Sequence, residues 1–233
     1  MTHIDAVPCN QLLAALPAGA LQAMLREGAL DWVSLDAGGA LHEQGRLIDQ
    51  VYFPDDAVIA FMAVASQRMT LEVGLVGDEG VAGIAVALGG MVSPVHAVVR
   101  RGGMALRMPA DAFRLALDRH PELAQAVARH AHDLMVQATQ TAFCSHFHLL
   151  EARLARSLLM MRDRVQTDAL HLTHEILGLA LGVRRVGITK AATSLQQRGL
   201  ISYSRGEIRI LNRQGLEMAS CGCYALVKKL AEA

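Results

Sequence analysis

The chain has 233 residues, of which 52 % are hydrophobic and 19 % are charged. This composition supplies enough apolar surface for folded cores and excludes a disordered chain, and the length fits two modest domains. The formal charge is zero, but residues 1–144 carry 9 Lys and Arg against 15 Asp and Glu (net −6), and residues 145–233 carry 13 against 7 (net +6). A basic second part indicates that this part binds a polyanion.

The sequence shows no signal for a membrane or for secretion. No apolar run reaches about 18 residues without a charge or a turn residue. The first ten residues lack a basic region followed by an apolar one, and the four cysteines have no repeating spacing. We therefore expect a cytoplasmic protein with reduced thiols and no membrane partner.

The first part of the chain reads as one helical segment followed by many short strands. Residues 12–30 have helical spacing, with Pro17 near a helix start. From residue 31 to about residue 108, short apolar stretches alternate with Gly-rich turns, which is typical of an antiparallel sandwich or barrel. The expected strands span residues 51–53, 58–64, 69–75, 96–100 and 105–108, and the fold class is α+β.

A long helix is expected after these strands. Residues 109–117 predict a short helix, and Pro121 fits the first turn of a helix that runs without Gly or Pro to about residue 150. Its positions at alternating four-three spacing form a heptad seam that is half polar or small. Such a seam either packs on its own domain or pairs with a second copy, and polar seam residues favour the dimer. We predict a parallel dimer seam made by Leu123, Val127, His130, Leu134, Gln137, Thr141 and Cys144.

The C-terminal part has the order helix, tight turn, helix, hairpin. Thr173 is an N-cap candidate for the first short helix, which ends at Gly182, and Gly199 stops the second helix. Two short strands joined as a hairpin follow. This order is the pattern of a winged helix-turn-helix. The expected helices span residues 151–164, about 174–181 and 184–197, and the strands span 200–203 and 208–211, joined by residues 204–207.

The second of these helices carries a cluster of cations at its start. A recognition helix places such side chains against base edges and phosphates in the major groove. Polar side chains on the same helix and a cation at the hairpin tip would add contacts. The alternative is a solvated basic helix, for which the turn glycine, the cations, the inward pattern and the hairpin would all have to coincide by chance. The predicted DNA-binding residues are Thr173, Arg184, Arg185, Thr189, Lys190, Ser194 and Arg205.

Three segments of this part resemble the C-terminal domain of the Crp/Fnr superfamily of bacterial transcription regulators. They are Leu172–Gly178, Leu181–Arg185 and Leu195–Ile201. The order of a β-rich domain, a long helix and a winged helix also fits this family over nearly the whole chain. The resemblance implies a cyclic-nucleotide-binding-like β-roll of jelly-roll type in residues 1–120, a dimerisation helix in residues 121–150 and a DNA-binding domain in residues 151–233.

The resemblance also implies partners and roles. It implies a homodimer that binds a palindromic site in double-stranded DNA, and contact with RNA polymerase if the protein is an activator. Arg185 and Lys190 match two positions that read DNA in this family. Val186 lies where many members carry an acidic base-reading residue, so the usual half-site sequence of the family is not carried over.

The ligand chemistry of the implied β-roll departs from the cyclic-nucleotide binders. Residues Gly77–Val81 resemble the start of their phosphate cassette, but Ser93–His96 stands near the place of the phosphate-binding Arg. A buried phosphate without a matching cation is costly. We therefore predict no cofactor and do not expect cyclic AMP to bind, so the roll binds another small ligand or none. The candidate ligand-binding residues are Gly77, Glu79 and Ser93.

Two pairs of residues have the chemistry of metal ligands. Cys144 and His148 share a face of the long helix, and Cys221 and Cys223 form a tight pair near the end of the chain. We interpret the first pair as a polar helix end and the second as incidental thiols, so no metal site is predicted, although metal binding and redox sensing stay open. Cys9 stands alone in the first 143 residues, which excludes the N-terminal iron–sulfur ligands of some Crp/Fnr members.

Two hypotheses follow for function. The first is a homodimeric, sequence-specific transcription regulator that a small ligand at the β-roll could switch. The second is a ligand-binding or protein-interaction module whose winged helix contacts protein. No nucleophile elbow, P-loop or zinc-protease motif occurs in the sequence, so we do not expect an enzyme. The operator, the effector and the direction of regulation stay open.

Overall fold

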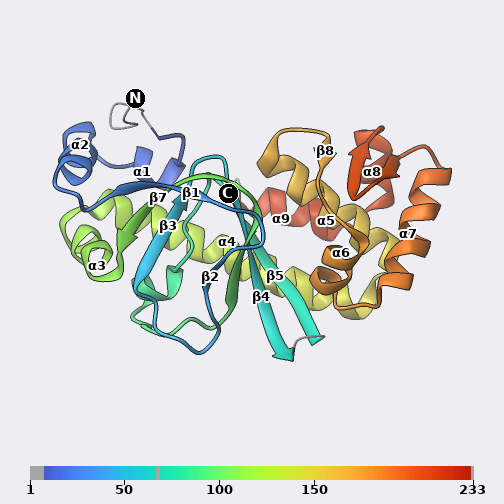
Figure 1. The fold of residues 1–233 in the computed structure, drawn as a ribbon, viewed down its shortest axis with the longest axis horizontal. Coiled ribbons are helices and arrows are strands. Elements are labelled where there is room, and N and C mark those ends of the chain that lie inside the picture. Colours follow the sequence, from blue (N-terminus) through green and yellow to red (C-terminus); the bar gives the residue numbers. More distant parts are fainter. Residues whose placement is uncertain (1–7, 67–68, 232–233) are drawn as a thin grey trace. The chain divides into compact units, whose positions relative to one another are not determined.

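The computed structural model describes residues 8–66 and 69–231. The chain forms two compact units (Figure 1). The N-terminal unit comprises the residues up to Phe61 together with Val76–His132, and the C-terminal unit comprises Met62–Leu75 together with the residues from Asp133 onward. The long helix is therefore divided between the two units, and the predicted boundaries at residues 120 and 150 stay a prediction.

The antiparallel β structure that the sequence predicts lies mostly in the N-terminal unit, while the strand residues from Met62 to Leu75 belong to the C-terminal unit. One sheet has the order β1-β7-β3, and β7 pairs antiparallel with both neighbours. A second sheet has the order β2-β6-β4-β5. All five expected strands are present, whereas β1 and β2 were not predicted. The strands are β1 (Asp31–Leu35), β2 (Ala40–His42), β3 (Gln50–Pro54), β4 (Val58–Ser66), β5 (Met69–Val76), β6 (His96–Arg101) and β7 (Gly103–Pro109).

The core of this unit lies between strands β3 and β7 and the flanking helices. Val51 and Phe53 alternate inward on β3, and the Phe53 ring meets Phe113 edge to face at 5.6 Å between ring centroids. The buried Asn10 caps the first helix and donates its side-chain N–H groups to the carbonyls of Pro54 and Gly80, at 2.8 and 2.9 Å. The helices are α1 (Gln11–Ala14), α2 (Ala18–Arg26), the 3₁₀ helix η2 (Ile84–Leu88) and α3 (Ala110–Arg119).

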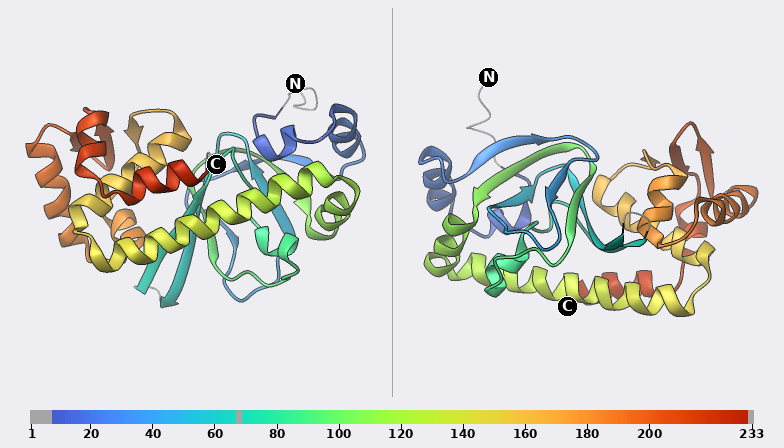
Figure 2. Two further views of the ribbon diagram at one scale, coloured as in Figure 1. Left: turned by 180° about the vertical axis from the view of Figure 1, so that it is seen from behind. Right: turned by 60° about the horizontal axis from the view of Figure 1, so that its bottom comes forward.

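Helix α4 (Pro121–Phe147) is one uninterrupted helix of 27 residues (Figure 2). Its first turns bury Leu123 and Val127 in the N-terminal core. His130 is 3 % exposed, and its Nε2 lies 3.2 Å from the backbone nitrogen of Val81. The ring packs directly on Gly80, where a Cβ atom would overlap it.

The later seam positions of α4 are also covered by the same chain. The Gln137 side chain is buried and accepts the N–H of Leu75 at 3.0 Å, the Thr141 hydroxyl accepts from Arg156 at 3.2 Å, and Cys144 is 2 % exposed. The periodicity therefore identified the buried face of the helix. Five of the seven seam residues are buried within the same chain, whereas Leu134 and Thr141 are half-buried. Pairing of this helix with a second copy stays a prediction.

The C-terminal unit is a helical bundle with a small sheet, and it confirms the predicted winged helix-turn-helix. Its sheet has the order β8-β10-β9, so the expected hairpin gains a third strand. The two last helices were not predicted. The elements are α5 (Leu150–Val165), β8 (Ala169–Leu170), α6 (His174–Leu181), α7 (Arg185–Gln197), β9 (Ile201–Ser204), β10 (Glu207–Ile210), α8 (Arg213–Ala219) and α9 (Cys223–Ala231). Within the described ranges, no helix is long and apolar enough to cross a membrane.

Candidate nucleic-acid interface

Helix α6 begins at a side-chain cap, and glycines shape the tight turn between α6 and α7. The Thr173 hydroxyl accepts the N–H of Ile176 at 3.1 Å and so begins α6. Gly182 ends this helix at φ 65°, in the left-handed region that a residue with a side chain rarely adopts. A Cβ atom at Gly178 would lie 3.0 Å from the carbonyl oxygen of Val183, so the turn also needs a small residue there.

Helix α7 has one buried face and one exposed face. Ile188, Ala191, Ala192 and Leu195 are buried. The other face carries the exposed side chains of Arg185 and Lys190, and Arg184 stands exposed at the N-cap. Cations at a helix N-terminus lie unfavourably with respect to the helix dipole, so these residues do not stabilise the helix. A negatively charged partner at this end of α7 would offset the charge of these side chains.

Ion pairs separate the cations of this region into two groups. Arg198 pairs with Glu151, and Arg209 pairs with Glu207. In the described part of the chain, no acidic side chain pairs with the second group, Arg184, Arg185, Lys190 and Arg205. The second group is therefore the one available to a polyanion, and its members are four of the seven predicted DNA-binding residues.

The hairpin of the wing is tighter than predicted. Ser204 pairs with Glu207, so the turn consists of Arg205 and Gly206 alone. Both residues have positive φ, 50° and 85°, which is the geometry of a type I′ turn. The predicted strands were therefore one residue out of place, and Arg205 is held exposed at the tip.

His174 and Tyr203 form a contact that the sequence analysis missed. The His174 ring is 7 % exposed and stacks on Tyr203 at 4.0 Å between centroids. The Thr189 hydroxyl donates to the carbonyl of Arg185 at 3.1 Å, so it accepts from Nδ1 of His174 at 3.0 Å. One imidazole thus links α6, α7 and β9. A single His in an apolar stretch gives no signal of this role.

Burial sets the protonation state of His174. Desolvation first, and then the positive charge of Arg185, hold the pKa of His174 below its ordinary value. The ring is therefore neutral at neutral pH, and Nε2 is buried without a hydrogen-bond partner among the described residues.

The other predicted DNA-binding residues have more restricted surroundings. Thr189 is exposed but already makes the two hydrogen bonds given above, and Ser194 is half-buried. Thr173 is exposed while its hydroxyl serves as the helix cap. These three residues therefore lie at the surface of the motif with fewer unused polar groups than the four cations have.

The predicted ligand-binding residues of the N-terminal unit lie in two separate turns. Glu79 accepts the backbone N–H of Gly77 at 2.9 Å. Ser93 is buried, and its hydroxyl donates to the carbonyl of Val95 at 2.7 Å. Among the hydrogen bonds of the described residues, none joins Ser93 to Gly77 or Glu79. The Glu79 carboxylate and the Ser93 hydroxyl thus each bond to the backbone of their own turn.

An exposed cationic helix after a tight turn, followed by a two-stranded wing, defines a winged helix-turn-helix DNA-binding domain. The family comparison gives the same result. Residues 152–219 match the Crp-like helix-turn-helix domain. Together with the antiparallel N-terminal unit and the long helix, this domain gives the chain the fold of the Crp/Fnr transcriptional regulators.

Solved structures of this fold align with almost the whole of their own length. A Crp/Fnr-family transcriptional regulator of Thermus thermophilus is 24 % identical, with a TM-score of 0.67 over 87 % of this chain and 99 % of that one. FixK2 of Bradyrhizobium japonicum is 15 % identical, with a TM-score of 0.71 over 82 % and 98 %. The c-di-GMP-responsive regulator CLP of Xanthomonas campestris is 14 % identical, with a TM-score of 0.69 over 83 % and 99 %. No curated protein sequence matches the chain.

Proposed function

We propose that the protein is a sequence-specific transcription regulator that binds double-stranded DNA as a homodimer in the cytoplasm. The observation that carries this proposal is the set of exposed cations without acidic partners on α7 and the wing: Arg184, Arg185, Lys190 and Arg205. An uncompensated cationic surface on a helix that can enter the major groove is suited to the phosphates and base edges of DNA.

The cations have different tasks in this proposal. Arg185 and Lys190 stand on the exposed face of α7 and read base edges, for which Arg has a bidentate geometry toward guanine. Arg184 at the helix start and Arg205 at the wing tip bind phosphates and fix the position of α7 in the groove. Val186 is 59 % exposed on the same helix and offers an apolar contact to a thymine methyl group.

A dimer would let two short recognition helices bind one operator together. Helix α4 exposes Met135, Phe143 and Phe147, which are 61, 48 and 65 % accessible, and the rings of Phe143 and Phe147 lie 4.7 Å apart between centroids. Exposed apolar side chains along one helix favour an interface. Two copies related by a two-fold axis would present their α7 helices to half-sites about one DNA turn apart, which requires a palindromic operator. Contact with RNA polymerase would follow if the protein activates transcription.

The N-terminal unit is proposed to respond to a ligand other than a cyclic nucleotide, or to none. Its candidate residues use their polar groups within their own turns, and no Arg occupies residues 93–96. Isothermal titration with cyclic AMP is expected to show no binding at millimolar concentration. Saturable binding in the micromolar range would overturn this part of the proposal.

Fluorescence anisotropy with random-sequence duplex DNA tests the proposal as a whole. Wild-type protein is expected to bind at low salt and to weaken steeply as salt rises, because bound cations release counterions. Arg184→Ala with Arg185→Ala should lose most of this affinity. Arg46→Ala is the matched control, because Arg46 pairs with Glu43 outside the motif. Absence of DNA binding by the wild type at low salt would favour a winged helix that contacts protein.

A further inference from the structure

Four potential metal ligands that are far apart in the sequence meet in the C-terminal unit. Cys144 and His148 come from the end of α4, and Cys221 and Cys223 come from the start of α9. Their three sulfur atoms and one imidazole nitrogen all lie within 4.8 Å of one another. Cys144 Sγ is 3.3 Å from Cys221 Sγ, and Cys223 Sγ is 3.6 Å from His148 Nδ1.

Local structure aims each pair at the same point. Cys144 and His148 are four residues apart, and the N–H of His148 bonds to the carbonyl of Cys144 at 3.1 Å, so both side chains share the last turn of α4. Cys221 and Cys223 flank Gly222 where α9 begins. The positive end of the helix dipole of α9 favours thiolates at this place.

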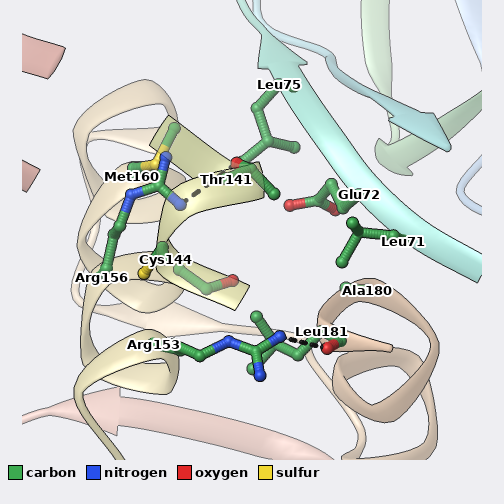
Figure 3. Close-up of a pocket in the computed structure, with 12 residues that line it drawn as sticks. Leu71, Glu72, Leu75, Thr141, Cys144, Arg153, Arg156, Met160, Ala180 and Leu181 are labelled. Carbon is green, nitrogen blue, oxygen red and sulfur yellow. Dashed lines mark hydrogen bonds between the residues drawn. The ribbon is translucent and has the colours of Figure 1, made fainter. Parts of the chain in front are cut away.

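The cluster is dry and has positive charge beside it. All three cysteines are at most 8 % exposed, and they form a packed cluster with Ala152 of α5. Arg153 and Arg156 of α5 lie near the sulfur atoms, and Figure 3 shows Cys144 beside both arginines.

Arg156 gives an independent sign that the cluster carries negative charge. Its side chain is 7 % exposed and makes one hydrogen bond, to Thr141, while Nε and Nη2 have no partner in the described chain. A buried guanidinium with unused donors is costly unless an anion offsets its charge. Three thiolates bound to a divalent cation have a net charge of −1, which meets this need.

We propose that Cys144, His148, Cys221 and Cys223 bind one Zn²⁺ ion in a closed tetrahedral site. Zn–S bonds of about 2.3 Å and a Zn–N bond of about 2.0 Å place tetrahedral ligand atoms ~3.5–3.8 Å apart. The distances from Cys144 Sγ to Cys221 Sγ and from Cys223 Sγ to His148 Nδ1, at 3.3 and 3.6 Å, already fall near this range. Three sulfurs and one imidazole are a ligand set of structural zinc sites, and hard cations such as Mg²⁺ prefer oxygen.

The ion would fasten α9 to the end of α4. Because the four ligands leave no open position for water, the site is structural and does not activate a substrate. A disulfide between Cys144 and Cys221 would use two of the four groups and leave Cys223, His148 and the charge of Arg156 without a partner. The zinc site accounts for all of them, and it does not depend on the proposed DNA-binding function.

Cobalt binding to the reduced full-length protein tests the site. Co²⁺ is expected to bind with one equivalent per chain and to give thiolate-to-cobalt charge-transfer bands and the intense visible bands of tetrahedral coordination, which Zn²⁺ then abolishes. Cys221→Ser with Cys223→Ser should lose the spectrum. Cys9→Ser, which changes the exposed cysteine outside the cluster, should keep it. A spectrum that survives the double substitution, or none in the wild type, would overturn the proposal.

A second measurement uses only wild-type protein, so it stays decisive if the variants do not fold. One equivalent of Zn²⁺ is expected to slow alkylation of Cys144, Cys221 and Cys223 at least about tenfold relative to chelator-treated protein, as read by peptide mass spectrometry. Cys9 should react at the same rate in both samples. If Cys144, Cys221 and Cys223 react at the same rate with and without zinc, the site is contradicted. A visible iron–sulfur spectrum after anaerobic reconstitution with iron and sulfide would also contradict a zinc site.

Discussion

At the residue scale, the neutral imidazole of His174 on α6 contacts both the wing and α7. It stacks on Tyr203 of the wing and donates to Thr189 of α7. The amide of Tyr203 also donates to the side chain of Gln196 on α7, at 3.2 Å. The wing and the recognition helix therefore share polar contacts that fix their relative angle. Protonation of His174 would place a buried charge next to Arg185.

Stability should therefore depend on pH through His174. The pKa of His174 is lower in the folded chain than in the unfolded chain, where it is about 6.5. The unfolded chain therefore binds more protons below about pH 6.5. The contribution of His174 to the free energy of unfolding is complete above that pH and is lost as the pH falls through the folded pKa. His174→Phe keeps the stack and removes this titration. We expect urea unfolding to show a smaller loss between pH 7.5 and 5 in the variant, with a residual loss from His42, whose pKa burial also lowers. Equal losses would contradict the assignment.

Gly80 offers a second test at this scale. A Cβ atom there would overlap the His130 ring, so Gly80→Ala should destabilise the N-terminal unit by about 1–3 kcal/mol, as overpacked sites do. Gly19→Ala is the control, because Gly19 lies in α2 with open space around its Cα, and should raise stability by up to about 1 kcal/mol. Thermal unfolding measures both, and a harmless Gly80→Ala would show that His130 packs elsewhere.

At the element scale, α4 shows what periodicity can and cannot predict. The heptad spacing identified Leu123, Val127 and His130 correctly as one face. It could not show that the same chain covers this face, because that depends on partners such as Val81 and Leu75 that are distant in sequence. In contrast, α7 was predicted nearly to the residue, since its glycine stops and its inward pattern are local signals.

The exposed face of α4 leads to a prediction on assembly. Phe143→Glu places a charge among the exposed apolar residues of this face and should weaken the proposed dimer, because burying an unpaired carboxylate is costly. Analytical ultracentrifugation should show at least a tenfold rise of the dimer Kd, about 1.4 kcal/mol. Leu115→Glu, an exposed apolar position on α3, should leave it unchanged. A monomeric wild type would contradict the dimer itself.

At the scale of the whole molecule, the functional groups come from distant parts of the chain. The DNA-binding cations lie within residues 184–205, and local signals in the sequence revealed them. Of the four proposed metal ligands, Cys144 and Cys221 are 77 residues apart in the sequence, and only the fold brings the four together. Each pair alone looked incidental, since no spacing rule connects a helix end to a second helix beyond the wing.

Removal of zinc should loosen the C-terminal unit. A ligand at about 100 times its Kd stabilises the folded state by roughly 2.7 kcal/mol. Chelator-treated protein is therefore expected to unfold at a lower temperature than zinc-loaded protein, and Cys221→Ser with Cys223→Ser should remove the difference. Calorimetry of the reduced protein measures this. Identical transitions with and without zinc would show that the ion contributes nothing to folding.

The most direct test of the account is the comparison of Arg185→Ala with Arg184→Ala on an operator selected from random DNA. If Arg185 reads a base, its loss should cost about 1–3 kcal/mol on the operator and relax the sequence preference at one position of each half-site. If Arg184 binds a phosphate, its loss should weaken all sequences alike and reduce the salt slope by about one. Unchanged specific binding in Arg185→Ala would contradict the assignment of α7 as the recognition helix.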